Sequence, residues 1–164
     1  MDRQYFLSLY RLDLRDRYLV WYTDETDGYV LDTQRSIPSF QTQGAAVAFA
    51  NSMGLTIVEE EPQLQNLDAA EAWIKNKRFR TVDCVALLEA WNLLADISTS
   101  VGGKFDPDKK VTNKIYDKLF YGNNLPPVTP DGRSYHPIWS RKERAIIREV
   151  LESGISIFRN VVKC

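Results

Sequence analysis

The spacing of apolar residues changes near Asp68, and this change restricts the possible folds more than any other feature of the sequence. Before it, apolar and aromatic residues occur in short runs bounded by turn residues, as in β-strands. After it, they recur three and four residues apart, as on one face of an α-helix. Strands followed by helices are typical of α+β proteins rather than doubly wound parallel sheets. Because the sequence has no repeat or obvious linker, we expect residues 1–164 to form a single α+β domain.

The N-terminal part is expected to form an antiparallel β-meander with a short helix. The expected strands cover Tyr5 to Asp13, Tyr18 to Thr23, Tyr29 to Thr33 and Leu55 to Val58. Asp27 and Gly28 supply the residues of a tight reversal between the second and third strands. Small and apolar residues from Ala45 to Met53 predict a short, closely packed helix, which Gly54 is suited to end.

The C-terminal half is expected to be mainly α-helical. The expected helices cover Ala69 to Lys77, Val82 to Ser98, Asp108 to Tyr121, and a last helix that includes Ile147 to Phe158. Asp68 is expected to be the N-cap of the first of these helices. Ser140 and Glu143 form a capping-box signature before the last one. The second helix has the strongest pattern, with one apolar face made of Cys84, Leu87, Leu88, Trp91, Leu94 and Ala95.

Acidic residues are concentrated in one part of the chain. The net charge is −1, but residues 1–76 carry 12 acidic and 6 basic side chains, whereas residues 77–164 carry 10 acidic and 15 basic ones. Between Asp24 and Glu71, nine carboxylates accompany a single cation, Arg35. This asymmetry is the most informative electrostatic feature of the sequence.

The sequence predicts a cytoplasmic protein that does not bind membranes. No apolar run approaches the roughly 18 residues that span a bilayer, and the first four residues lead into a strand pattern, unlike a signal peptide. Cys84 lies in a helical pattern and Cys164 ends the chain. Neither has a nearby Cys or His partner in the sequence, so we expect no disulfide framework, no metal site and no cofactor.

Known catalytic motifs are missing from the sequence, so we expect a protein that is not an enzyme. There is no phosphate-binding loop, dinucleotide fingerprint, HExxH, GxSxG or paired CxxC, and His136 is the only histidine. One alternative is a small hydrolase-like enzyme that uses His136, Asp131 and carboxylates from the first half. Another is a regulatory nucleic-acid-binding module whose basic helices carry Lys77, Arg78, Arg80, Lys109, Lys110, Lys114 and Lys118.

Two acidic runs and one long loop are candidate binding elements. Asp24, Glu25 and Asp27 lie at the expected hairpin, and Glu59 to Glu61 follow the fourth expected strand. These carboxylates fit solvated surface, a protein-binding patch or a cation site, although the first run does not match an EF-hand loop. Tyr121 to Pro137 is a long irregular stretch with several prolines, suited either to docking a partner or to rigid packing through Leu125, Tyr135 and Trp139.

Several segments resemble bacterial immunity proteins of contact-dependent growth inhibition systems. They are the N-terminal Tyr/Trp-rich meander, the segment Ser39 to Thr42 leading to Ala45-Ala46 and Phe49-Ala50, the segment Gly54 to Ile57, and the run Ile115 to Pro126 followed by Trp139-Ser140. The resemblance implies a cytoplasmic protein that binds and neutralises the C-terminal toxin domain of a matching secreted effector, often a nuclease, without itself binding nucleic acid.

An acidic patch suits a nuclease partner, because a nuclease cleft that holds phosphates is usually basic. Aromatic side chains beside the patch would slow dissociation. On local charge density and these aromatic anchors, the expected toxin-binding residues are Asp24, Glu25, Asp27, Tyr29, Glu59, Glu60, Glu61, Asp68, Glu71 and Trp73.

Overall fold

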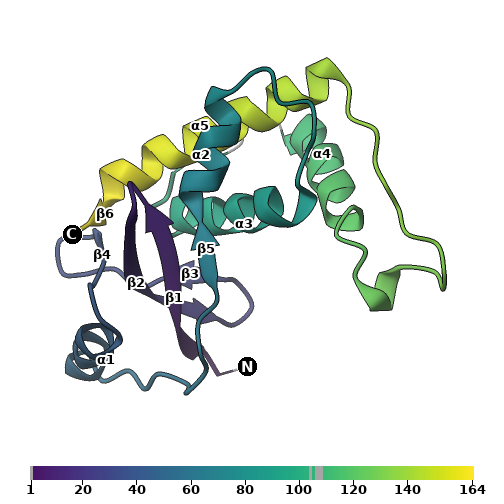
Figure 1. The fold of residues 1–164 in the computed structure, drawn as a ribbon. Coiled ribbons are helices and arrows are strands. Elements are labelled where there is room, and N and C mark those ends of the chain that lie inside the picture. Colours follow the sequence, from purple (N-terminus) through teal and green to yellow (C-terminus); the bar gives the residue numbers. More distant parts are fainter. Residues whose placement is uncertain (1, 104, 106–108) are drawn as a thin grey trace.

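The computed structural model describes residues 2–103, 105 and 109–164, and its fold is α+β with a mainly helical C-terminal half (Figure 1). The strands are β1 (Gln4–Leu12), β2 (Arg15–Thr23), β3 (Gly28–Tyr29), β4 (Ile37–Pro38), β5 (Leu64–Asn66) and β6 (Val162–Lys163). The α-helices are α1 (Gln43–Ser52), α2 (Leu67–Lys75), α3 (Cys84–Ser100), α4 (Lys109–Tyr121) and α5 (Arg141–Val161). A short 3-10 helix, η1, covers Pro126–Val128. The predicted fold class is therefore confirmed.

The main sheet has the strand order β3-β2-β1-β5. β2 pairs antiparallel with both β1 and β3, which confirms the N-terminal meander, although β3 is only two residues long. β5 then adds to β1 in parallel, so the complete sheet is mixed. A strand over residues 55–58 is wrong, because Ile57 forms only an isolated bridge with Tyr5 and the named strand follows Pro62 instead. β4 and β6 make a separate two-stranded pair near the C-terminus.

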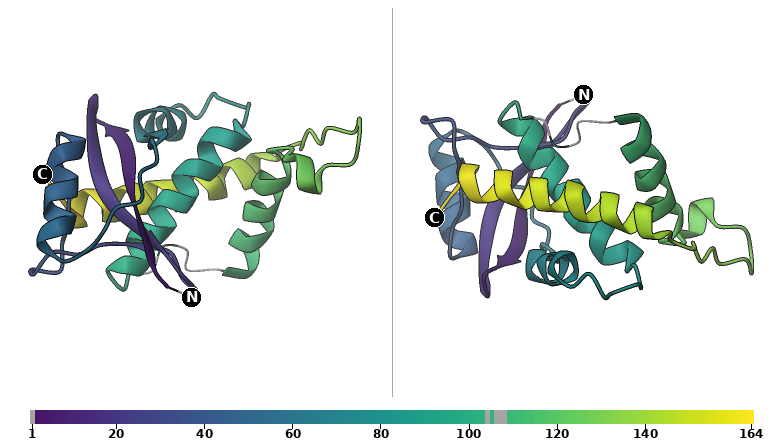
Figure 2. Two further views of the ribbon diagram at one scale, coloured as in Figure 1. Left: turned by 90° about the horizontal axis from the view of Figure 1, so that it is seen from below. Right: turned by 90° about the horizontal axis from the view of Figure 1, so that it is seen from above.

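Helices cover both faces of the sheet. On one face, Val20 and Val30 pack with Ala50 of α1. On the other face, Tyr10 and Leu19 belong to the large core that also contains the buried residues of α2, α3, α4 and α5. Consecutive strand residues point to opposite faces, so the adjacent apolar pair Leu19-Val20 supplies both cores. Figure 2 shows α5 running along the molecule from the strands to α4.

The N-termini of α2, α3 and α5 are capped by the side chain of the residue directly before each helix. Ser140 and Glu143 form the predicted capping box of α5, and Asp83 caps α3. The expected N-cap at Asp68 is wrong, because Asn66 caps α2 by accepting from the amide of Ala69 at 3.0 Å. α2 therefore begins at Leu67, two residues earlier in the chain than the apolar pattern indicates.

The long connection between α4 and α5 extends away from the helices (Figure 1). Asn124 ties the two ends of this loop together, because its Nδ2 donates to the carbonyl oxygen of Tyr135 at 2.9 Å. Leu125 and Tyr135 are 43% and 44% exposed, so of the three side chains expected to pack the loop only Trp139 is buried. Among the described residues, no helix is both long and apolar enough to cross a bilayer.

Candidate functional site

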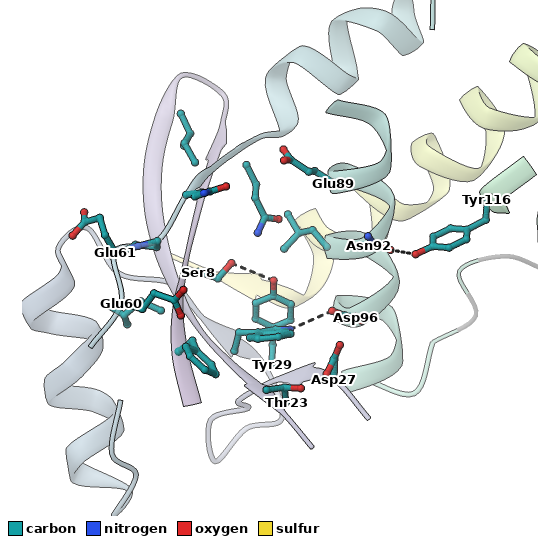
Figure 3. A pocket seen from close by; sticks show the side chains of 18 residues that line it. Ser8, Thr23, Asp27, Tyr29, Glu60, Glu61, Glu89, Asn92, Asp96 and Tyr116 are labelled. Carbon is teal, nitrogen blue, oxygen red and sulfur yellow. Dashed lines mark hydrogen bonds between the residues drawn. The ribbon is translucent and has the colours of Figure 1, made fainter. Parts of the chain in front are cut away.

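An acidic cavity of about 650 Å³ lies between one face of the main sheet and α3 (Figure 3). One wall comes from β1, β2 and the segment 60–65 that leads into β5, and the opposite wall comes from α3. Tyr116 of α4 closes one side, and its hydroxyl donates to Oδ1 of Asn92 at 2.8 Å. The cavity therefore joins parts of the chain that are far apart in sequence.

Negative charge is the distinguishing property of this cavity. The carboxylates in its lining are Asp27, Glu60, Glu61, Glu89 and Asp96. Within the described part of the chain, no Lys, Arg or His lines the cavity, and none of these five carboxylates forms an ion pair. Glu61 accepts only a long hydrogen bond from Nε2 of Gln43, at 3.4 Å. The walls thus hold like charges together without a cation, which raises the negative potential inside.

α3 presents a polar stripe to the cavity. Glu89, Asn92 and Asp96 occur at positions i, i+3 and i+7, so they lie on one side of the helix. The other faces of α3 are buried, with Leu87 and Leu94 in the core. This packing fixes the position of α3. Glu89 and Asp96 therefore point from the helix toward the wall that carries Glu60 and Glu61 (Figure 3).

Asp96 is the most perturbed carboxyl group of the cavity. Oδ2 of Asp96 accepts a hydrogen bond from Nε1 of Trp21 at 3.2 Å. Burial raises the pKa of Asp96 to about 6, and the nearby charge of Asp27 adds to this, while the bond from Trp21 partly opposes it. Partial desolvation by the cavity walls also raises the pKa of Glu89, although that side chain is exposed overall, and Asp83 contributes to the rise. Both carboxylates would gain from a cation in the cavity.

Tyr29 lies buried at the base of the cavity and is 3% exposed. Its hydroxyl shares a hydrogen bond with Oγ of Ser8 at 3.2 Å, and its backbone amide donates to Oγ of Ser100 at 2.8 Å. Burial raises the pKa of Tyr29 above its usual range. The tyrosine thus connects β3 to β1 and α3, and it supports the cavity from beneath rather than offering an exposed side chain.

The fold resembles that of the SatS C-terminal domain. That crystal structure, determined in complex with bromine, matches with a TM-score of 0.54 over 97% of this chain and 92% of the other. The two sequences are 14% identical, so the likeness shows the fold alone. The sequence matches no protein-family model and no curated protein.

The hairpin and acidic-run residues predicted to bind a partner fall into two groups. Asp27, Glu60 and Glu61 line the cavity together. The remaining members of those runs are not in its lining: Glu25 and Glu59 are exposed, and Asp24 is held by Arg3 at 2.6 Å. The hydrogen bond from the backbone amide of Thr26, followed by that from Arg3, lowers the pKa of Asp24.

Asp68, Glu71 and Trp73 lie away from the cavity, and each already has partners within the chain. The Asp68 carboxylate accepts the backbone amides of Asp13 and Leu14 at the β1–β2 turn. Glu71 pairs with Arg159 on α5, whose hydrogen bond lowers the pKa of that carboxyl. Trp73 is buried and donates its Nε1 proton to the carbonyl oxygen of Thr81 at 2.8 Å.

Local charge density does not identify Glu89 and Asp96 as site residues, because each is an isolated carboxylate among the apolar residues of α3. The i, i+3, i+7 spacing of Glu89, Asn92 and Asp96 is the sequence signal that identifies them. Such a polar stripe on a helix that is otherwise buried marks a face turned toward solvent or a cavity.

The residues of the alternative enzymatic site lie on the exposed loop after α4. His136 and Asp131 are both exposed, and in the described structure His136 makes no hydrogen bond to a carboxylate. His136 borders a shallow depression beside Cys84 and Trp139. Among the described residues, no group of three or more His, Cys, Asp or Glu side chains is placed to hold a metal ion.

Proposed function

We propose that this protein is an immunity protein of the contact-dependent growth inhibition type, and that it binds a cognate toxin domain through the acidic cavity. The single observation that carries the proposal is the set of five carboxylates in a cavity whose described lining holds no cation. A protein gains nothing in stability from such a cluster, because like charges repel and partly buried carboxylates are desolvated. A cationic partner turns the same arrangement into a favourable one.

The lining fits the side chain of an arginine or lysine from the partner. Phe6 and Trp21 stand beside the carboxylates with ring centroids 5.8 Å apart, and Tyr116 adds a third half-buried ring. A guanidinium group binds both to carboxylates and to aromatic faces. A toxin that cleaves nucleic acid exposes such cations where it holds phosphates, which supports a nuclease as the partner.

In this proposal, the toxin-binding surface includes fewer residues of the hairpin than local charge density predicts, and it also includes residues of α3. It retains Asp27, Glu60 and Glu61 and adds Glu89 and Asp96. Asp24, Glu25 and Glu59 would act at longer range, by steering a basic partner toward the cavity. Asp68, Glu71, Trp73 and the buried Tyr29 would act by holding the fold.

Co-expression with a toxin domain encoded by a neighbouring reading frame of the same genome, where one is found, tests the function. We expect cells that produce the toxin domain in the cytoplasm to grow when this protein is co-expressed, and we expect the two proteins to purify as a stable complex. A toxin that kills equally well in the presence of this protein, with both proteins soluble and expressed, would contradict the proposal.

A matched pair of charge reversals tests the cavity itself. Glu60→Lys with Glu89→Lys changes two lining carboxylates, whereas Asp117→Lys with Asp131→Lys makes the same charge change at exposed positions outside the lining. At low salt, the first pair should slow association about tenfold or more and weaken its salt dependence, while the second should have a much smaller effect. Equal slowing by both pairs would assign the effect to net charge and remove the cavity from the interface.

A further inference from the structure

A second cavity, of about 910 Å³, lies between the segment that connects α2 to α3 and the first half of α5. We refer to it as the basic pocket. Its cationic lining residues are Lys77, Arg78, Arg80, Arg141, Arg144 and Arg148. Glu149 and Glu152 also line the pocket, so six positive and two negative side chains leave a formal charge of +4. The charge of this pocket is opposite to that of the acidic cavity.

α5 contributes half of these cations from one stripe. Arg141, Arg144 and Arg148 are at positions i, i+3 and i+7, so their side chains leave the helix on the same side. The three other cations come from residues 77–80, which lie opposite in the pocket lining. Two chain segments separated by about 60 residues of sequence thus bring their positive charges together.

The six cations lack carboxylate partners in the described structure. Elsewhere in the chain, the basic side chains of Arg3, Arg11, Lys75, Lys118 and Arg159 form ion pairs. None of the six pocket cations is within ion-pair distance of a carboxylate in the described residues, although Glu149 and Glu152 are in the same lining. The pocket therefore keeps its positive charge available to an outside anion.

Two of the arginines are held in place by backbone carbonyl groups. Arg148 stacks over the ring of Trp73 at 4.4 Å and donates from Nη2 to the carbonyl oxygen of Phe79 at 2.9 Å. Arg144 donates from Nη1 to the carbonyl oxygen of Trp139 at 2.6 Å. Neutral acceptors order the guanidinium groups without cancelling their charge, so little side-chain entropy is lost when an anion binds.

The charged form of Arg148 is disfavoured in the basic pocket. Burial lowers the pKa of Arg148, and the neighbouring charge of Arg144 lowers it further. Its Nε atom is buried and has no hydrogen-bond partner in the described structure. An anion in the pocket would offset the repulsion between these two arginines.

We propose that the basic pocket is a binding site for a compact ligand with several phosphate charges, such as the diphosphate or triphosphate group of a nucleotide. Arginine presents planar pairs of N–H donors that match phosphate oxygens. The six cations surround one cavity rather than following a track across the surface, which favours a compact polyphosphate over an extended nucleic-acid backbone. This site is independent of the toxin-binding proposal, since the two cavities share no lining residue.

Binding of inorganic pyrophosphate, ATP and a short single-stranded oligonucleotide to the full chain tests the proposal. Titrations at low salt should show pyrophosphate and ATP binding, and Arg78→Gln with Arg80→Gln and Arg141→Gln should weaken both by about tenfold or more. The control is Lys109→Gln with Lys110→Gln and Lys114→Gln, which removes the same charge from exposed positions on α4. It should change the affinity less than about twofold.

Two indole protons report where the ligand binds. The Nε1 proton of Trp73 bonds to Thr81 beside the basic pocket, whereas that of Trp21 bonds to Asp96 in the acidic cavity. Pyrophosphate should shift the NMR signal of the Trp73 indole proton and leave that of Trp21 in place, with Trp73→Phe used for assignment.

Equal losses in the two triple variants, or no binding of any phosphate probe, would overturn the proposal. Binding of the oligonucleotide alone would also overturn it, by assigning the cations to a nucleic-acid backbone. Because these readouts involve no toxin, their failure leaves the proposed immunity function untouched.

Discussion

Trp21 and Asp96 are joined by a hydrogen bond from the indole Nε1 to Oδ2 at 3.2 Å, which links β2 to α3 across 75 residues of sequence. The bond orients the carboxylate at the cavity wall without neutralising it. Burial holds the pKa of Asp96 at about 6, so at neutral pH the folded protein carries a partly desolvated negative charge. A side chain that opposes folding in this way is a sign of a functional constraint.

Replacing Asp96 by Asn should stabilise the protein at neutral pH. The folded-state pKa of about 6 lies above the ordinary aspartate value of 3.8, so the contribution of Asp96 to stability is present at low pH and is lost as the pH rises through 6. The side-chain oxygen of asparagine can still accept the hydrogen bond from Nε1 of Trp21, but asparagine cannot ionise. The free energy of unfolding should rise by about 1–2 kcal/mol near pH 7, less than the full shift implies because the group is partly exposed.

Urea unfolding at neutral and acidic pH measures this effect. The gain should disappear below about pH 4, where Asp96 is protonated in both states. Asp117→Asn, at an exposed position on α4, serves as the control and should leave stability nearly unchanged. A variant Asp96→Asn that is no more stable than the parent near neutral pH would show that the carboxylate is not penalised by burial.

Binding of the proposed toxin partner should weaken as the pH falls through about 6, because a cation in the cavity favours the ionised form of Asp96. Affinity measured by calorimetry between about pH 7.5 and pH 5.5 should drop, and binding near pH 6 should release a proton from the protein. Asp96→Asn should bind more weakly and lose this part of the pH dependence. A pH profile that is the same in the parent and the variant would exclude Asp96 from the interface.

Structural features that depend only on residues close together in the sequence could be predicted. Ser140 and Glu143 of the capping box are three positions apart, so local chemistry determines this cap. The reversal expected at Asp27-Gly28 is instead made by residues 24–27, because Gly28 belongs to β3 and pairs with Tyr22. β5 could not be predicted in this way, because it has three residues and pairs in parallel with β1, where Leu64 lies beside Leu9. Its position depends on tertiary packing rather than on any pattern within the strand.

The same distinction applies to the acidic cavity. Asp27, Glu60 and Glu61 lie in a segment whose charge density is visible in the sequence, and the fold brings them to one lining. Glu89 and Asp96 complete that lining from α3, more than 20 residues further along the chain. No local count of carboxylates connects the two groups, since only the docking of α3 against the sheet places them opposite each other.

Gly154 allows α5 to approach α3 closely. A Cβ atom added at this position would collide with the ring of Phe105 and lie 2.9 Å from Cβ of Leu94. Gly154→Ala should therefore destabilise the protein by about 1–3 kcal/mol in chemical unfolding. Gly44→Ala is the matched control, because Gly44 lies in α1 with nothing within 4 Å of an added Cβ, and it should stabilise by about 0.5–1 kcal/mol. A neutral Gly154→Ala would mean that the α3–α5 contact can relax.

Asp68 should stabilise the β1–β2 hairpin rather than the start of α2. Asp13 and Leu14 form the turn, and both have positive φ values, 54° and 61°, which are unfavourable for residues with a side chain. The two carboxylate oxygens of Asp68 accept the amides of these residues at 2.7 and 2.8 Å, so the turn is held by a side chain from another element.

Asp68→Ala should remove both bonds and lower the free energy of unfolding by about 1.5–3 kcal/mol. Asp68→Asn keeps one acceptor oxygen and should cost less, while Glu25→Ala controls for the loss of an exposed carboxylate. Amide hydrogen exchange locates the effect: the amides of Asp13 and Leu14 should exchange faster in Asp68→Ala, whereas that of Ala69, which bonds to Asn66, should be protected as in the parent. Faster exchange at Ala69 with unchanged exchange at the turn would instead assign Asp68 to the helix.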